Sequence, residues 1–415
     1  MPSSRVNSLR MDTRVALLTG GTDKPYALGL ASALAAQRVQ VEFIGSNELD
    51  CPQVRAIPGL VFLNLRGDQR EEVPFAGKLV RVLVYYGRLV RYVATAKPMI
   101  LHILWNSRFE VFDRTVLMVY YRLLGKRVVL TAHNVNGAAR DDKDGWANRL
   151  SLRIQYRLCD HVFVHTDAMK RELVAAFGAR EQRVTVIPFG INDTMPHSEL
   201  KPAAARQRLG MAVNGRALLF FGQIAPYKGL EYLIAAVAVL AKTGEDVRLI
   251  VAGRVKRGSE GYWGSIRRSI TDLGIEDLVV QKIRFIPDDE VETYFKAADA
   301  VVIPYVDIFQ SGVPFLAFSF GLPVIATDVG SLREDVTSET GLLCKPKDPA
   351  DLARVIAAFY RSALHREPDR AQERIRGLAA ERHSWETVVD RTRAVYASLA
   401  AEGRSPHIFG SRTGP

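Results

Sequence analysis

Cysteine is scarce in this chain, and long apolar runs are missing. Three cysteines, Cys51, Cys159 and Cys344, occur among 415 residues and show no CxxC spacing. This odd number of separated thiols argues against a disulfide framework and a zinc site, and it fits a reducing cytosol. No window holds the roughly 20 apolar residues that a membrane span needs, and the start lacks the apolar core of a signal peptide. We therefore expect a cytoplasmic protein.

The chain is instead rich in core-forming residues and in positive charge. Hydrophobic residues make up 48% of its 415 residues, and because single cores stop growing near roughly 250–300 residues, two domains are expected. The net charge of +11 indicates an anionic partner, which is a nucleic acid, a membrane surface or a phosphorylated substrate. No recognised nucleic-acid-binding module accompanies the charge, so we expect no nucleic-acid partner.

Strand-like segments alternate with helical patterns, which predicts α/β domains with parallel sheets covered on both faces. The predicted strands of the first series are residues 15–19, 39–44, 61–65, 100–103, 127–131 and 161–164. Those of the second series are residues 217–221, 247–252, 279–285, 300–304 and 323–327. Ligands of such sheets bind beyond the carboxyl ends of the strands. We therefore expect two doubly wound Rossmann-like domains that face each other across a cleft.

Composition also predicts the boundaries of these domains. Residues 192–206 carry proline, alanine and polar residues without a strand pattern, and we interpret them as the linker. The predicted parts are a disordered N-terminus (1–11), an N-terminal domain (12–195), a C-terminal domain (196–383), a helix that could cross back to the first domain (384–400) and a flexible tail (401–415).

The segment VVIPYVDIFQSGVPFLAFSFGLPVIATDVGSLRED, residues 301–335, predicts a phosphate site. It reads as a strand, a loop containing Gln310, Ser311 and Gly312, a short apolar helix and a second strand. Glycine after a strand lets the backbone approach a ligand, and a helix start presents free N–H groups to an anion. The alternative is an ordinary strand–helix–strand unit.

A second segment, LLFFGQIAPYKGLEYLIAAV, ends a strand at Gly222 and places Lys228 and Gly229 at a helix start. A lysine there offers an anion a point charge beside oriented N–H donors, although a solvated lysine at a turn is the alternative. This loop and the Ser311 loop should reach the same edge of one sheet. Two converging loops suit a diphosphate better than a single phosphate.

These motifs together resemble those of a known family. FFGxIxPYKGLEYL followed by QSGVxxLAxxFGLPVIATDVGSLxE is similar to the family-4 retaining glycosyltransferases, which have the GT-B fold. AHNVN (132–136), VIPFGIN (186–192) and SWETVVDRT (384–392) extend the resemblance over nearly the whole chain. It implies a hexosyltransferase-type reaction that needs no metal or cofactor and retains the anomeric configuration. The implied donor is a nucleotide-diphosphate sugar. The implied acceptor is a glycan or a lipid-linked acceptor, as in polysaccharide or glycoconjugate biosynthesis.

The resemblance also implies roles for single residues. Lys228 matches the diphosphate-binding lysine, Ser311 to Val313 match the loop that meets the sugar and phosphates, and the backbone near Ile286 matches the segment that reads the base. The predicted donor-binding residues are Gly222, Gln223, Lys228, Arg254, Ile286, Gln310, Ser311, Gly312 and Val313.

Two features depart from the family pattern. Gln223 stands where the family often has arginine. Two glutamates eight positions apart are also missing, because the matching positions are Ile308 and Leu316 in one register, and Phe309 and Ala317 in the other.

The chain thus resembles a QSGV-type branch, in which Gln310 and Ser311 take over part of the recognition. Asp307 and Glu334 are the remaining nearby carboxylates, and their role is either structural or sugar-binding.

In the first domain, KRVVLTAHNVN leads a strand into His133, which we predict to be catalytic together with Lys228. A histidine at a strand's carboxyl end should face the cleft, whereas a core histidine is the alternative. The resemblance implies a histidine near the sugar and the acceptor, where it orients groups or supports the departing proton.

Gly20, Gly21, Thr22 and Asn134 form the predicted acceptor side of the cleft. The glycines end the first strand, so a tight turn that needs positive φ remains the alternative.

No metal site is predicted. The DxD match from Asp142 to Asp144 lies outside the donor domain and is interpreted as a solvated charge cluster. His161 and His165 fall on a strand pattern, which would separate them by roughly 13 Å.

Positive charge gathers in the segment FAGKLVRVLVYYGRLVRYVATAK, residues 75–97. Lys78, Arg81, Arg88 and Arg91 recur at spacings of three and seven, which predicts a basic stripe on an apolar helix. Such a helix suits an anionic membrane surface. A domain-packing helix with a solvated basic edge is the alternative.

The sequence therefore predicts a cytoplasmic retaining glycosyltransferase that could lie peripherally on the inner face of the cell membrane. Two alternatives stay open, a GT-B-fold nucleotide-sugar epimerase and a non-catalytic module that binds a sugar nucleotide or a membrane.

Overall fold

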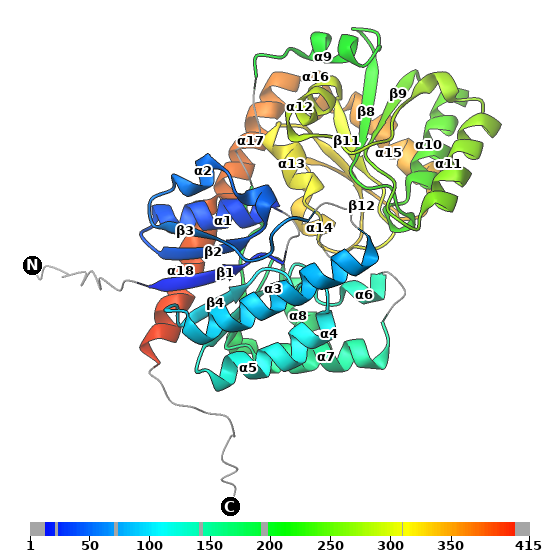
Figure 1. The fold of residues 1–415 in the computed structure, drawn as a ribbon. Helices are drawn as coiled ribbons and strands as arrows, with labels where there is room; N and C mark the ends of the chain where they lie inside the picture. The colour runs from blue at the N-terminus through cyan, green and yellow to red at the C-terminus, as the bar shows by residue number, and fades with distance from the viewer. Residues whose placement is uncertain are drawn as a thin grey trace, which may run out of the picture. The chain divides into compact units, whose positions relative to one another are not determined.

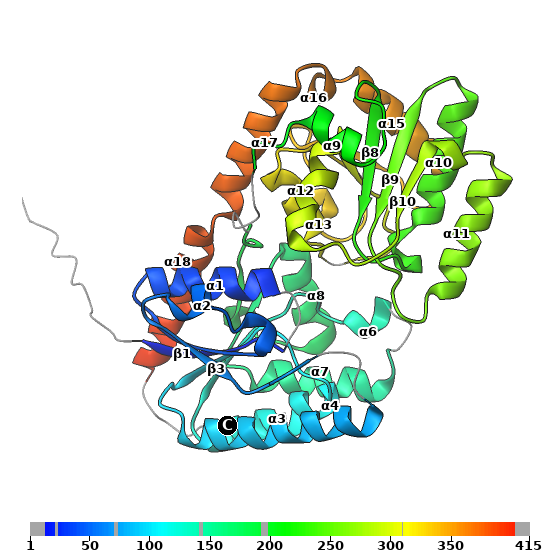
Figure 2. The same cartoon turned by 45° about the horizontal axis from the view of Figure 1, so that its top comes forward.

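The computed structural model describes residues 13–20, 24–69, 74–140, 144–191, 198–308 and 310–402. The chain divides into two compact units, one made of residues 1–190 and 385–415 and the other of residues 191–384 (Figures 1 and 2). The described part of each unit is built on one parallel sheet with helices on its faces, which confirms the predicted α/β fold class.

The described part of the first unit holds a seven-stranded parallel sheet in the order β3-β2-β1-β4-β5-β6-β7. Its strands are β1 (Arg14–Leu18), β2 (Gln40–Gly45), β3 (Leu60–Asn64), β4 (Ile100–Ile103), β5 (Arg127–Thr131), β6 (His161–Val164) and β7 (Val184–Val186). The order reverses between β1 and β4, and ligands of doubly wound sheets bind at such a switch point. Sequence analysis missed β7, because three residues are too few for a strand pattern.

Helices cover both faces of this sheet (Figure 1). They are α1 (Lys24–Ala36), η1 (Asn47–Leu49), α2 (Pro52–Arg55), α3 (Phe75–Thr95), α4 (Glu110–Phe112), the π-helical turn η2 (Asp113–Leu117), α5 (Met118–Leu123), α6 (Gly137–Arg140), α7 (Trp146–Leu158), α8 (Asp167–Phe177), η3 (Glu181–Arg183) and α18 (Trp385–Ala401). On β1, Ala16 and Leu18 join the core beneath α3, α5, α7 and α8. Val15 and Leu17 join the opposite core beneath α1 and α18. Side chains that alternate between two cores explain the continuous apolar run of the strand.

The C-terminal helix α18 is tied to the first unit by Trp385, which packs where two glycines leave room. A Cβ on Gly29 would lie 2.3 Å from the Trp385 ring, and one on Gly190 would lie 2.6 Å from it. The indole of Trp385 therefore fits here because neither Gly29 nor Gly190 has a side chain.

The second unit holds a parallel sheet in the order β10-β9-β8-β11-β12-β13 within the described residues. Its strands are β8 (Arg216–Phe221), β9 (Val247–Ala252), β10 (Val279–Lys282), β11 (Ala300–Ile303), β12 (Val324–Thr327) and β13 (Gly341–Cys344). Strand β13 was not predicted, and the predicted strand 279–285 extends three residues beyond the end of β10. The switch point of this sheet lies between β8 and β11.

The predicted linker, residues 192–206, is corrected in part. Residues 192–197 lie outside the described residues, but α9 (Pro202–Arg208) is a helix whose first residue is proline. Proline fits the first helical position because its missing N–H would have no partner there. Arg206 on α9 pairs with Asp299 at 2.8 Å, so this segment belongs to the second unit.

The other helices of the second unit are η4 (Pro226–Lys228), α10 (Leu230–Lys242), α11 (Glu260–Asp272), η5 (Glu276–Leu278), α12 (Asp288–Ala297), α13 (Val313–Ser319), α14 (Leu332–Asp335), α15 (Pro349–Arg361), α16 (Ala363–Arg366) and α17 (Pro368–His383). Across the described residues of both units, no helix combines the length and the apolar content that crossing a membrane would require. The predicted N-terminal segment 1–11 and residues 403–415 of the predicted tail lie outside the described residues.

The Trp385 packing predicts opposite effects of two glycine-to-alanine changes. Gly29→Ala should lower the melting temperature because the new methyl group meets the indole. Gly87→Ala on α3 is the matched control, since nothing lies within 4 Å of its Cβ position. Alanine in that helix should raise the free energy of unfolding by up to about 1 kcal/mol. Thermal melts check both, and a Gly29→Ala protein as stable as Gly87→Ala would contradict this packing.

Candidate active site

The loops that follow β8 and β11 meet through glycine. Gly229, with φ of 61°, lies against Pro304, and a Cβ there would be 2.1 Å from the Pro304 carbonyl oxygen. Gly253, which follows β9, packs equally closely against Gly222, because an added Cβ would lie 1.9 Å from the Gly222 carbonyl oxygen. The Val306 N–H also donates to the carbonyl of Tyr227 at 2.8 Å. The predicted convergence of the two loops is therefore present at the switch point.

Lys228 is buried where these loops meet. Its side chain is only 7% exposed, and its Nζ donates to the Tyr305 hydroxyl at 2.8 Å. A Cβ on Gly222 would lie 3.1 Å from the same Nζ, so glycine keeps the space beside the ammonium open. Among the described residues no carboxylate pairs with Lys228. A buried ammonium without an anion is costly, which favours an anionic ligand here.

The loop after β11 supplies buried polar groups. Gln310 is 9% exposed and Ser311 is 7% exposed. The Ser311 hydroxyl accepts from the Val313 N–H at 3.3 Å, and Gly312 precedes α13. In the described part of the chain the Gln310 Oε1 has no hydrogen-bond partner, and neighbouring Phe309 lies outside that part. A ligand hydroxyl or N–H could satisfy this oxygen.

The remaining predicted donor residues lie after β8, β9 and β10. Gln223 and Arg254 are exposed, whereas Ile286 is buried. The Arg254 guanidinium lies 6.0 Å from the ring centroid of Phe285, whose side chain is 63% exposed. Sequence analysis missed Phe285 because it assigned the residue to the strand, which ends at Lys282. An exposed aromatic ring at the carboxyl end of β10 could stack on a flat ligand.

A carboxyl group that sequence analysis did not single out follows β12. Asp307 and Glu334 are both exposed, but Asp335 is half-buried and accepts from the Ser331 hydroxyl at 3.0 Å. Burial raises the pKa of Asp335 to about 7. Its carboxyl group therefore changes charge near neutral pH, which nothing in the sequence pattern indicated.

In the first unit, residues after β1, β4 and β5 surround His133. Gly20 has φ of 60°, and a Cβ there would lie 2.5 Å from the Trp105 carbonyl oxygen. The Trp105 ring stacks on His133 with centroids 4.2 Å apart. Asn134 is half-buried, while Gly21 and Thr22 lie outside the described residues. The imidazole is thus packed among aromatic rings just after β5, and His133 is half-buried.

Hydrogen bonds along the carboxyl edge determine which His133 nitrogen carries a proton. His165 Nδ1 lies 3.2 Å from the Ile187 carbonyl, which can only accept, so a neutral His165 leaves Nε2 unprotonated. That Nε2 lies 3.0 Å from His133 Nδ1 and accepts from it. Burial holds the pKa of His133 well below its ordinary value, so the ring is neutral. His133 Nε2, which has no partner among the described residues, is therefore an acceptor.

The residues considered for metal binding have other partners. Asp144 accepts from the side chains of Asn148 and Arg149, and Asp142 lies outside the described residues. His161 contacts the Thr185 hydroxyl at 2.9 Å. No group of three or more His, Cys, Asp or Glu residues in the described part could hold a metal ion.

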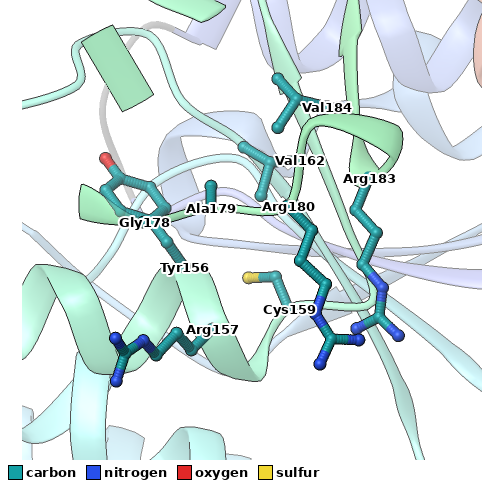
Figure 3. A pocket seen from close by; sticks show the side chains of 9 residues that line it. All are labelled: Tyr156, Arg157, Cys159, Val162, Gly178, Ala179, Arg180, Arg183 and Val184. Carbon is teal, nitrogen blue, oxygen red and sulfur yellow. The ribbon is translucent and has the colours of Figure 1, made fainter. Parts of the chain in front are cut away.

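A cavity of about 190 Å³ lies at the opposite, amino-terminal edge of the first sheet (Figure 3). Arg157, Arg180 and Arg183 line it, and Figure 3 shows Arg157 extending away from the other two arginines. Cys159 also lines the cavity, and burial raises the pKa of its thiol. The thiol therefore stays protonated and is a poor nucleophile.

Lys228→Ala should raise the Kd of a nucleoside diphosphate by about tenfold or more, because a charge-assisted contact is lost. Binding of the free nucleoside should change little. Lys242→Ala, which changes an exposed lysine at the end of α10, should leave both unchanged. Calorimetric titration measures the affinity of both variants for both ligands. If Lys228→Ala weakened binding of the nucleoside as much as binding of the nucleoside diphosphate, Lys228 would not contact the diphosphate.

The histidine pair predicts a spectroscopic result. Long-range ¹H–¹⁵N spectra should show His133 protonated on Nδ1 and bare on Nε2. His165→Phe removes the accepting nitrogen and should let the other tautomer appear, whereas His161→Phe, which lies on β6 away from this contact, should not. A wild-type His133 protonated on Nε2 would rule out the proposed hydrogen-bond direction.

Comparisons with known proteins agree with this architecture. The family described as Glycosyl transferases group 1 matches residues 215–362, and Glycosyltransferase Family 4 matches residues 25–194. A D-inositol 3-phosphate glycosyltransferase of Acidothermus cellulolyticus is 26% identical over 92% of this chain and 86% of its own length. One of the same name from Streptomyces scabiei is 27% identical over 98% of this chain and 96% of its own length.

Two solved structures share the fold. Anabaena HepE, in complex with UDP and glucose, has a TM-score of 0.71 at 20% identity and covers 93% of this chain and 100% of its own. Sucrose-phosphate synthase from Thermosynechococcus elongatus has a TM-score of 0.73 at 19% identity and covers 94% of this chain and 100% of its own. With two parallel-sheet units and both family matches, the chain belongs to the family-4 glycosyltransferases of the GT-B fold.

Proposed function

We propose that this glycosyltransferase moves a sugar from a nucleotide-diphosphate sugar to a glycan or lipid-linked acceptor, with retention of configuration and without a metal or other cofactor. The observation that carries the proposal is the buried Lys228 ammonium between the β8 and β11 loops, for which the described residues supply no carboxylate. A diphosphate supplies the missing negative charge. The complex of HepE with UDP and glucose supports this donor class.

Each unit would contribute different groups to the reaction. Negative charge builds on the leaving diphosphate as its bond to the sugar breaks, and Lys228 beside the N-terminus of α10 would stabilise that charge. The Gln310 Oε1 would accept from a sugar hydroxyl in place of the missing glutamates. Phe285 and Arg254 offer the base a flat face. His133 Nε2 would accept from a hydroxyl of the sugar or the acceptor.

A second acceptor class is favoured by the names of the curated relatives. Two proteins that align with nearly the whole chain are called D-inositol 3-phosphate glycosyltransferases. A phosphorylated cyclitol is therefore tested beside glycans and lipid-linked saccharides. Polysaccharide or glycoconjugate biosynthesis and a cytoplasmic location remain predictions.

A panel of UDP-, GDP-, ADP- and dTDP-sugars tests the donor class by thermal shift. A ligand at about 100 times its Kd adds roughly 2.7 kcal/mol to the free energy of unfolding, which is enough to rank donors. We expect one base to stand out, and Lys228→Ala should lose the shift while Lys242→Ala keeps it. If no nucleotide sugar raised the melting temperature, the proposed donor class would be contradicted.

Product analysis with the best donor then distinguishes the alternatives. Transfer to an acceptor with retained configuration, unchanged by a chelator, is the expected result. Conversion of the donor sugar with no acceptor present would instead indicate an epimerase. Donor binding without turnover against every acceptor class would indicate the non-catalytic module. Loss of transfer in His133→Ala with donor binding intact would assign this residue to the chemistry rather than to binding.

A further inference from the structure

Exposed apolar side chains are concentrated on one part of the first unit. In the described residues, fourteen of the nineteen exposed large hydrophobic side chains lie between Leu79 and Leu150. Single exposed hydrophobic residues are normal on a protein surface, whereas a contiguous group marks an interaction site. This concentration is too strong for random scatter.

Twelve of the fourteen side chains lie on helices that pack side by side, and the other two, Phe109 and Leu124, cap such helices (Figures 1 and 2). The Tyr120 hydroxyl of α5 donates to the Val90 carbonyl of α3 at 2.9 Å. The Arg114 side chain of η2 donates to Asn148 of α7 at 2.8 Å. We call residues 75–95, 109–124 and 146–158 together the three-helix face.

The apolar row on α3 is additional to the row that forms the core. Its core row includes Tyr85, Leu89 and Val93, which are buried. Val80 and Leu83 are each 58% exposed on the other side of the helix. The alternative interpretation of α3 as a domain-packing helix therefore explains its buried side but not its exposed apolar side.

The basic stripe predicted from the sequence is corrected. Thirteen residues at 3.6 per turn leave Lys78 and Arg91 about 140° apart around the helix. Lys78 and Arg81 are half-buried, and Arg81 lies 3.9 Å from Asp68. Only Arg88 and Arg91 are exposed beside the apolar row.

Charge on the whole three-helix face is nevertheless one-sided. Its sequence carries nine basic and two acidic residues, a difference of seven out of the chain's net +11. Both acidic residues have partners, since Glu110 pairs with Arg114 and Asp113 is buried against the Tyr86 hydroxyl. Carboxylates outside these ranges also pair with three of the nine cations, since Arg81 lies near Asp68, Arg122 pairs with Asp160 and Arg149 pairs with Asp144. The positive charge that the face presents therefore rests mainly on its other exposed arginines, which are Arg88, Arg91, Arg153 and Arg157.

We propose that the three-helix face docks on an anionic lipid bilayer. Its valine, leucine and phenylalanine side chains would enter the interfacial region, and its arginines would contact lipid phosphates. A second copy of this chain is disfavoured, because two faces with this excess of positive charge would repel each other. A nucleic acid would leave the apolar rows without partners. The proposal does not depend on transferase activity.

Co-sedimentation of the full chain with vesicles tests the proposal. Binding to phosphatidylcholine vesicles containing about 30% phosphatidylglycerol should exceed binding to pure phosphatidylcholine by tenfold or more, and it should weaken with added salt. Binding that is absent, or equal for both vesicles, would overturn the proposal.

Paired variants place the contact on this face. Val80→Asn/Leu83→Asn and Arg88→Gln/Arg91→Gln should each reduce the vesicle partition coefficient by about tenfold or more. Val239→Asn/Leu273→Asn and Arg267→Gln/Arg268→Gln are matched exposed pairs in the second unit and should bind as the wild type does. Equal losses in the control pairs would contradict the assignment. If sedimentation velocity showed a dimer of the wild type and a monomer of Val80→Asn/Leu83→Asn, the partner of this face would be a second copy of the chain and not a membrane.

Discussion

The close approach of the β8 and β11 loops is the constraint on which the proposed donor site depends. Gly229 can lie against the Pro304 carbonyl only because it has no side chain and tolerates positive φ. That approach places Lys228 beside Tyr305 and beneath the open space at Gly222. The Lys228 charge and the space beside it thus lie where the two loops meet, at the switch point of the second sheet.

In the first unit, the carboxyl edge of the sheet holds His133. Aromatic packing and the His165 contact hold the His133 ring in one tautomer, so that a single nitrogen is left to accept. A rigid neutral imidazole suits hydrogen bonding to a hydroxyl group better than it suits holding a charge. The first unit thus holds a buried hydrogen-bond acceptor and the second unit holds a buried cation.

Sequence predicted the elements whose physical signals are local. Apolar runs bounded by glycine located most strands, and the glycine–lysine motifs located the loops that converge. Signals that depend on tertiary packing could not be read in this way. Phe285 looked like a strand residue until the strand was seen to end at Lys282, and Asp335 looked no different from Glu334. The hydrogen bond between His165 and His133 joins residues 32 positions apart, which no local pattern encodes. The exposed apolar rows of 109–124 were equally hidden, because a core helix and a surface-docking helix have similar composition.

Hydrogen exchange with the preferred nucleotide sugar tests the central claim most directly. If the two loops hold the diphosphate together, amide protection should rise in peptides covering both 222–229 and 304–313 and be much smaller around the outer helix α16. Protection confined to one loop, or found mainly elsewhere in the second unit, would contradict a shared diphosphate site.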